Sequence, residues 1–217
     1  MPTVNKNIAK LISKKIYLIR HAETDLNRKG VVQGSGVDAS INDFGRMQAA
    51  KFYEKYKHVP FDKVYTSKLK RSIQTVEKFV NNDIPHQSLI GLNEINWGVG
   101  EGMPFNSEAD KYYYSVISKW QSGETDFPIE GGESPEDVLE RQRPALKEIL
   151  SNGKDQNILI CMHGRAMRVF LCLMLNYPLS LMDVFQHNNL CLYILNYTGS
   201  IFTIETFNDT SHLNSLQ

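Results

Sequence analysis

The hydrophobic pattern of the chain alternates short apolar runs with longer stretches in which apolar residues recur at helical spacing. The apolar runs are rich in β-branched and aromatic residues, as is typical of buried strands, and comprise residues 15–19, 61–65 and 157–162. The helical stretches that follow them are residues 43–57, 69–80 and 165–175. Strands that alternate with helices in this way predict an α/β fold with a mostly parallel sheet.

The same pattern accounts for most of the remaining chain. It predicts a short strand at residues 86–89, helices at 107–120 and 134–150, and a hairpin with strands at 190–196 and 200–207. No repeat or linker divides the sequence, so a single domain over residues 1–217 is expected. Within it we expect a lid-like insert at about 95–133 and, after Asn208, a loose tail.

Composition narrows the possible classes of function. Lys and Arg total 24 and Asp and Glu total 24, without a basic run, so binding to nucleic acid or to an anionic membrane is not expected. The apolar run at residues 169–175 is far shorter than the roughly 20 residues that cross a bilayer. No secretion signal is recognised, so a cytoplasmic location is expected. The three cysteines lack zinc-site spacing and are expected to be reduced core residues.

Polar residues with phosphate-binding chemistry follow the predicted parallel strands. They are Arg20 and His21, Thr66 and Ser67, and His163 and Gly164, with Arg71 one helical turn after the second strand. The carboxyl ends of parallel strands share one edge of a sheet, where ligands usually bind. Arginine presents a planar fork of donors that suits phosphate oxygens. The sequence therefore predicts a phosphoryl-binding site at this edge.

The motifs at this edge resemble those of a known family. Residues 20–27, Arg-His-Ala-Glu-Thr-Asp-Leu-Asn, resemble the R-H-G-E-T-x-x-N signature of the histidine phosphatase superfamily, the phosphoglycerate mutase-like proteins. Further segments match the family's motifs in order: Gln33-Gly34, residues 38–49, residues 66–75, Leu92-Asn93-Glu94, Gly132-Glu133-Ser134 and Met162-His163-Gly164. The resemblance covers residues 15–175.

This resemblance implies a fold, an activity and a set of site residues. The fold is a three-layer sandwich with a mostly parallel central sheet flanked by helices. The activity is metal-independent hydrolysis of a small phosphomonoester, with inorganic phosphate as product and no cofactor. The catalytic residues would be the nucleophile His21, the general acid and base Glu94, and the phosphoryl ligands Arg20, Arg71 and His163. The substrate-binding residues would be Asn27, Gln33, Gly34 and Gly164.

Some features of the sequence leave alternatives open. Ala22 and Met162 stand where the family usually has glycine and serine. A phosphoglycerate-type phosphomutase and a non-catalytic phospholigand-binding module are the alternatives to a phosphatase. A mutase of this family typically carries a basic insert, whereas the cations between residues 95 and 132 are Lys111 and Lys119 against six acidic residues. This acidity favours a substrate with an uncharged or partly aromatic remainder.

Overall fold

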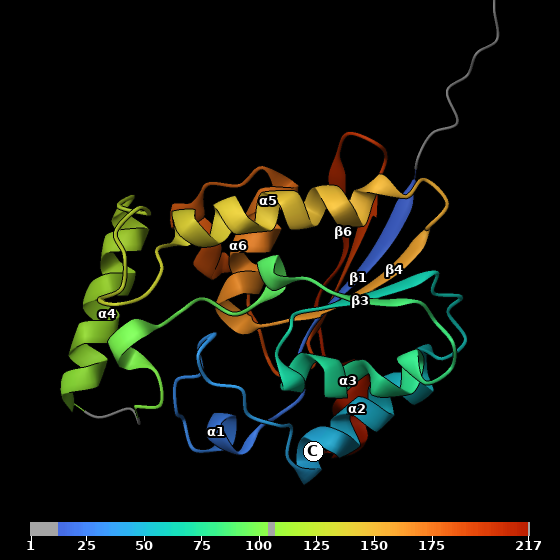
Figure 1. Ribbon diagram of the computed structural model, residues 1–217, viewed down its shortest axis with the longest axis horizontal. Coiled ribbons are helices and arrows are strands. Elements are labelled where there is room, and N and C mark those ends of the chain that lie inside the picture. The colour runs from blue at the N-terminus through green and yellow to red at the C-terminus, as the bar shows by residue number, and fades with distance from the viewer. Residues whose placement is uncertain (1–12, 104–106, 217) are drawn as a thin grey trace, which may run out of the picture.

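The computed structural model describes residues 13–103 and 107–216. Its centre is a six-stranded sheet of order β3-β2-β4-β1-β5-β6 (Figure 1). Strands β3, β2, β4 and β1 are parallel, whereas β5 runs antiparallel to β1 and β6 antiparallel to β5. The mostly parallel sheet is therefore confirmed. The strands are β1 (Lys14–Arg20), β2 (Lys63–Thr66), β3 (His86–Ser88), β4 (Asn157–Met162), β5 (Leu192–Tyr197) and β6 (Phe202–Asp209).

Helices cover both faces of this sheet (Figure 1). The pair α2 and α3 lies on one face and the pair α5 and α6 on the other, while α4 lies beyond the end of the sheet. The α-helices are α1 (Asp25–Arg28), α2 (Asp43–Tyr56), α3 (Lys70–Val80), α4 (Ser107–Ser122), α5 (Pro135–Ser151) and α6 (Gly164–Leu175). The short 3-10 helices are η1 (Ile90–Leu92), η2 (Gly98–Gly100), η3 (Leu179–Val184) and η4 (Ser211–Leu216).

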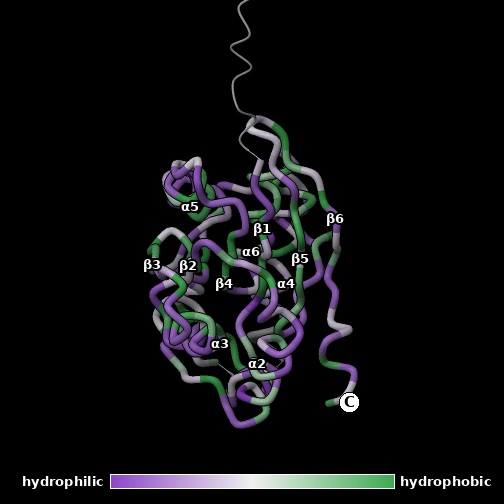
Figure 2. The backbone as a smooth tube through the Cα atoms, turned by 90° about the vertical axis from the view of Figure 1, so that its right-hand side faces the viewer, coloured by the Kyte–Doolittle hydropathy of each residue, from purple (hydrophilic) through white to green (hydrophobic). Residues whose placement is uncertain are grey.

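The core divides between the two faces because side chains of a strand alternate. In β1, Ile16 and Leu18 belong to the cluster that contains the inner faces of α5 and α6. Tyr17 and Ile19 belong to the cluster with α2 and α3. Strands β4 and β5 carry hydrophobic residues through the middle of the molecule (Figure 2). This arrangement is the three-layer sandwich that the resemblance implied.

Local signals explain where the main helices begin and end. The Asn42 side chain accepts a hydrogen bond from the Gly45 amide at 2.7 Å and starts α2. Ser134 and Asp137 form a reciprocal capping box at the start of α5. Helix α6 ends at Asn176, whose φ of 53° is left-handed, a conformation that asparagine tolerates well. These boundaries lie within two residues of the predicted ones.

The C-terminal segment differs from the prediction. Residues after Asn208 do not form a loose tail, because η4 packs against α2. Leu213 is buried, and the His212 ring lies 5.3 Å from the Phe52 ring, edge to face. The periodicity of so short a segment gave no signal, since the six residues of η4 make only two turns of 3-10 helix, too few for a hydrophobic repeat to be detected. Within residues 13–103 and 107–216, no helix has the length and apolar character to cross a membrane.

The strand register brings the predicted site residues together. Arg20 pairs with Met162, and Thr66 pairs with Cys161, so β1, β2 and β4 end at the same level. His21, Ser67 and His163 follow these ends directly. The site therefore lies at the carboxyl edge of the parallel strands, as expected for an open α/β sheet.

Candidate active site

His21 lies immediately after β1 and is 3% exposed. Its Nδ1–H donates to the carbonyl oxygen of Ala22 at 2.7 Å, which leaves the lone pair on Nε2. Burial and the positive charges of Arg20 and Arg71 lower the pKa of His21 well below its usual value. The imidazole is therefore neutral, with Nε2 in its nucleophilic form.

Side chains from distant segments fix the backbone around His21. The Asn189 amide nitrogen donates to the His21 carbonyl at 3.0 Å and to the Asn27 side-chain oxygen at 3.2 Å. The Thr75 hydroxyl accepts from the Ala22 amide at 2.9 Å. Sequence reasoning did not select Asn189 or Thr75. Asn189 comes just before β5, and a polar residue beside a buried strand was the only available signal.

Arg71 is fully buried behind His21, on the first turn of α3. Its Nε donates to Nδ1 of His163 at 3.2 Å, and its two Nη atoms donate to the carbonyl oxygens of Val37 at 2.5 Å and Gly34 at 3.2 Å. Burial lowers the pKa of Arg71 to about 10, which still leaves it charged near neutral pH. Each Nη retains one further hydrogen for a ligand.

His163 connects Arg71 to the second strand end. Since Arg71 donates to Nδ1, the ring hydrogen is on Nε2, which donates to the Ser67 hydroxyl at 2.7 Å. Burial and the charge of Arg71 lower the pKa of His163 well below its usual value. The rings of His163 and His21 lie 5.2 Å apart. Both nitrogens of His163 thus have protein partners, and donation to a phosphoryl oxygen would replace the bond to Ser67.

Arg20 occupies the end of β1 and directly precedes His21. One Nη donates to the carbonyl oxygen of His187 at 2.7 Å, and its buried Nε has no protein partner. The His187 ring lies against Gly164, because a Cβ on that glycine would be 3.4 Å from it. Burial and the charge of Arg20 lower the pKa of His187 to about 2. His187 is therefore a neutral wall of the site.

Glu94 follows η1 and sits on the N-terminus of α6, 6% exposed. Oε1 accepts from the amides of Ala166 at 2.7 Å and Ile95 at 2.9 Å, and Oε2 accepts from the Arg165 amide at 3.1 Å. The free N–H groups of a helix N-terminus favour a carboxylate there. Oε2 makes one bond only, so it retains capacity to hold or receive a proton.

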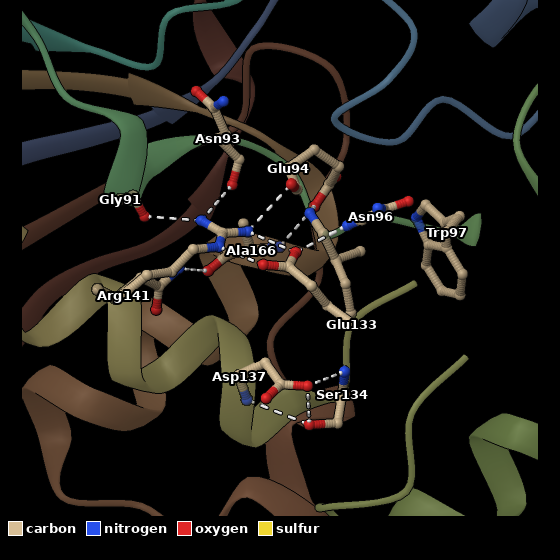
Figure 3. Close-up of polar contacts among 12 residues, drawn as sticks. Gly91, Asn93, Glu94, Asn96, Trp97, Glu133, Ser134, Asp137, Arg141 and Ala166 are labelled. Atoms are coloured by element: carbon tan, nitrogen blue, oxygen red, sulfur yellow. Dashed lines mark hydrogen bonds and ion pairs between the residues drawn. The ribbon is translucent and has the colours of Figure 1, made fainter. Parts of the chain in front are cut away.

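An ion pair holds the loop that carries Glu94 (Figure 3). Arg141 of α5 donates to the carbonyl oxygens of Gly91, Asn93 and Glu94 at 2.9–3.0 Å. It also pairs with Glu133 at 2.8 Å. The Arg141 guanidinium therefore supplies hydrogen-bond donors to carbonyl oxygens that backbone amides would satisfy in a regular strand or helix.

A cleft of about 220 Å³ lies among the residues described above. Of the sequence-predicted residues, Arg20, His21, Asn27, Gln33, Glu94 and Gly164 line it, whereas Gly34, Arg71 and His163 lie behind this lining. The further wall residues are Gly30, Val31, Val32, Trp97, Tyr113, Arg165 and His187. Tyr113 thus reaches the cleft from α4. The neighbouring Tyr112 hydroxyl instead accepts from the Glu130 amide at 2.8 Å.

The acidic residues of the segment between residues 95 and 132 whose side chains the structure describes do not line the cleft. Glu94 is the sole carboxylate among the described residues that line it. Glu101 turns Oε1 toward the amides of Trp97 at 3.1 Å and Gly36 at 3.3 Å, and Glu124 pairs with Lys119. A substrate with an uncharged or partly aromatic remainder therefore stays a prediction from composition. In the described ranges, no three His, Cys, Asp or Glu side chains cluster as metal ligands would.

Comparison with known proteins gives consistent matches. A Hydrogenobacter thermophilus protein, provisionally named phosphoserine phosphatase 2, is 26% identical over 205 residues, which is 94% of this chain and 99% of the relative. The human 6-phosphofructo-2-kinase/fructose-2,6-bisphosphatase 4 is 32% identical over 164 residues, covering 75% of this chain and 33% of that protein. This chain therefore spans about a third of that relative.

Solved structures agree with these matches. A phosphoserine phosphatase from Entamoeba histolytica superposes with a TM-score of 0.79 at 25% identity, covering 92% of this chain and 99% of that chain. YhfR from Bacillus stearothermophilus has the same fold, with a TM-score of 0.81 at 24% identity over 93% of this chain and all of its own. The family model of the histidine phosphatase superfamily (branch 1) matches residues 16–210. The chain therefore belongs to the histidine phosphatase superfamily, branch 1.

Proposed function

We propose that this phosphatase hydrolyses small phosphomonoesters through a phosphohistidine on His21, without a metal ion. The observation that carries the proposal is the state of His21. Its Nδ1–H donates to the Ala22 carbonyl, and burial together with the charges of Arg20 and Arg71 lowers its pKa, so that Nε2 is unprotonated. A neutral imidazole beside positive charge suits attack on an anionic phosphoryl group, because the arginines stabilise the charge on the transferring oxygens.

In the first step, Nε2 of His21 attacks phosphorus and the ester P–O bond breaks. Arg20 and Arg71 would bind the phosphoryl oxygens with donors that the protein leaves unused. Glu94, protonated on Oε2, would give its proton to the departing alcohol oxygen. Such general acid catalysis contributes roughly two to four orders of magnitude in rate.

In the second step, the Glu94 carboxylate takes a proton from water as the water oxygen attacks phosphorus. The N–P bond breaks, its electron pair returns to Nε2 of His21, and inorganic phosphate is released. The helix α6 amides that hold Glu94 keep Oε2 in place for both steps. The cycle ends with Glu94 protonated and His21 neutral.

The relatives suggest the size of the substrate. The Entamoeba phosphoserine phosphatase was solved with phosphoserine and with 3-phosphoglyceric acid. A cleft of about 220 Å³ suits esters of this size. The phosphomutase alternative and the binding-module alternative receive less support, because His21, Glu94 and Arg20, to which we assign the catalytic roles, line one cleft.

The test is release of p-nitrophenol from p-nitrophenyl phosphate in the presence of EDTA. We expect turnover by the wild type, and a loss of about 10⁴-fold or more in His21→Ala, since the covalent route is removed. His58→Ala, at an exposed position, is the matched control and should retain full activity. Rapid quenching with radioactive substrate should give a base-stable, acid-labile phosphoprotein in the wild type alone. No turnover by the wild type would overturn the proposal.

A further inference from the structure

Arg165 is a buried guanidinium at the cleft that the proposed chemistry does not use. It follows Gly164 on the first turn of α6 and is 4% exposed. Its two Nη atoms bond to Asp183 at 2.5 Å and to the Tyr113 hydroxyl at 3.2 Å. Its Nε is buried without a hydrogen-bond partner. An unpaired donor on a buried charge is costly unless a ligand completes it.

The charge of Arg165 is only partly balanced. Asp183 is shared, because the same Oδ1 also accepts from Arg168 at 2.5 Å. Its other oxygen accepts from the neutral amide of Gln121 at 2.9 Å. Two guanidinium groups therefore face one carboxylate, and this corner of the protein holds an excess positive charge. Aromatic rings at 5.9 Å and 5.6 Å, those of Trp97 and Trp120, keep water from it.

The position of Glu94 shows which part of a substrate lies near this charge. A general acid must contact the leaving oxygen, so the leaving alcohol lies on the Glu94 side of the phosphoryl group. The amide of Arg165 is bonded to Oε2 of Glu94 at 3.1 Å. Arg165, Trp97 and Tyr113 line the cleft on this side. Arg165 is thus a cation that lines the cleft on the side proposed for the leaving alcohol.

The positive charge of the arginines at and near the cleft also exceeds the negative charge of a phosphate monoester. Arg20 and Arg165 line the cleft, and Arg71 contacts His163. Arg168 shares Asp183 with Arg165, so these four arginines are accompanied by the two carboxylates of Glu94 and Asp183. When Glu94 is protonated as the acid, the net charge is more positive than the two negative charges of the phosphoryl group. One further negative charge on the substrate would balance the site.

We propose that Arg165 determines specificity for phosphate esters whose alcohol part carries a carboxylate. This inference rests on the proposed function, since it assigns the leaving-group side of the same cleft. The carboxylate is held by the excess charge of Arg165, with Nε as the free donor. A charged hydrogen bond of this kind corresponds to about a tenfold to hundredfold higher kcat/KM for an ester with the carboxylate than for one without it.

The test uses two esters that differ only at this group: 3-phosphoglycerate, with a carboxylate, and glycerol 3-phosphate, with a hydroxymethyl group in its place. We expect the wild type to have a kcat/KM ratio of about tenfold or more in favour of 3-phosphoglycerate. Arg165→Gln should lower this ratio by about tenfold or more, because kcat/KM for 3-phosphoglycerate falls further than kcat/KM for glycerol 3-phosphate. Arg165→Lys should keep most of the ratio, because it keeps the charge.

The matched control is Arg143→Gln, which removes an exposed arginine that pairs with Glu140. It should leave the ratio unchanged. If Arg165→Gln does not fold, Asp183→Asn provides the opposite test: loss of the counter-charge should raise the ratio by about threefold or more.

A wild-type ratio near one, or a ratio that Arg165→Gln or Asp183→Asn leaves unchanged, would overturn the inference while p-nitrophenyl phosphate turnover keeps the proposed function intact. Absence of turnover with all three esters would instead refute the proposed function.

Discussion

The two sides of the cleft are built by different means. The side that we propose to bind the phosphoryl group, called the phosphoryl side below, consists of residues that directly follow parallel strands, such as His21, Ser67 and His163, and the sheet register brings them to one edge. The side that we propose to bind the leaving group, called the leaving-group side below, gathers Tyr113 and Arg165 from α4 and α6 and Asp183 from η3, through helix packing. Substitutions on the two sides should therefore have different signatures.

The largest effect is expected from Arg71→Ala, on the phosphoryl side. Loss of a donor to the transferring oxygens should reduce kcat/KM by about a hundredfold to a thousandfold. The loss should be equal for p-nitrophenyl phosphate, glycerol 3-phosphate and 3-phosphoglycerate, because all three share the phosphoryl group. Steady-state kinetics with the three esters checks this, with the exposed Arg46→Ala as control. Unequal losses would show that the two sides are not separable.

Glu94→Gln lies between the two sides and should depend on the leaving group. Glycerol 3-phosphate releases an alkoxide, which needs a proton to leave, so its kcat/KM should fall by about a hundredfold or more. For p-nitrophenyl phosphate, whose phenolate leaves without a proton, kcat/KM should fall by less than about tenfold. The ratio of the two losses is the measurement. Identical losses would argue that Glu94 only orders the α6 N-terminus.

Arg141→Met removes the group that holds the Glu94 loop. Loss of its charged hydrogen bonds to carbonyl oxygens and Glu133 should lower the free energy of unfolding by about 2 kcal/mol. Turnover should fall by about tenfold, because the acid is no longer fixed. Urea unfolding and kcat check both. Arg143→Met, at an exposed pair, should change stability by no more than about 0.5 kcal/mol.

Protonation of the two buried histidines on the phosphoryl side should have a smaller effect, which is on the stability of the protein. His21 and His163 have pKa values well below the unfolded value of 6.5. The unfolded chain therefore binds protons that the native protein does not, so stability is retained above about pH 6.5 and falls as pH decreases below it. Lowering the pH from about 8 to 6 should cost about 1 kcal/mol or more. In urea unfolding, the free energy of unfolding of His163→Gln should depend less steeply on pH than that of the wild type. An equal slope would contradict the assignment of His163 as buried and neutral.

The smallest effect is expected from Tyr113→Phe, on the leaving-group side. The change removes a hydroxyl 3.2 Å from Arg165 and keeps the ring. We expect the preference for 3-phosphoglycerate over glycerol 3-phosphate to change by less than about threefold, with no effect on p-nitrophenyl phosphate. A uniform loss for all three esters would instead connect α4 to the phosphoryl side.

The difference between the two sides also explains what the sequence could predict. The strands, the main helices and the residues after the strand ends follow from apolar periodicity and from short motifs, and the sheet edge collects them. His21 and Glu94 were selected in this way, and their roles as nucleophile and acid stay predictions of the motif.

The remaining features depend on tertiary packing. Asn189 approaches His21 across 168 positions of chain, and no local pattern signals that contact. Arg165 looked like an ordinary helix residue, and only the fold buries it between α4 and η3. The acidic segment is a second example. Composition counts side chains but does not tell which of them face the cleft, as Glu101 demonstrates.

The contacts of Arg141 have a consequence for sequence divergence. Arg141 binds the Glu94 loop through carbonyl oxygens, which every amino acid supplies, so drift at Asn93 would leave this contact intact. Position 91 is different, because a Cβ there would lie 2.4 Å from the Arg141 carbonyl oxygen. Descendants of this protein are therefore expected to retain Gly91 whatever residue stands at position 141, because the clash is with a backbone oxygen, whereas position 93 can vary without loss of the contact to Arg141.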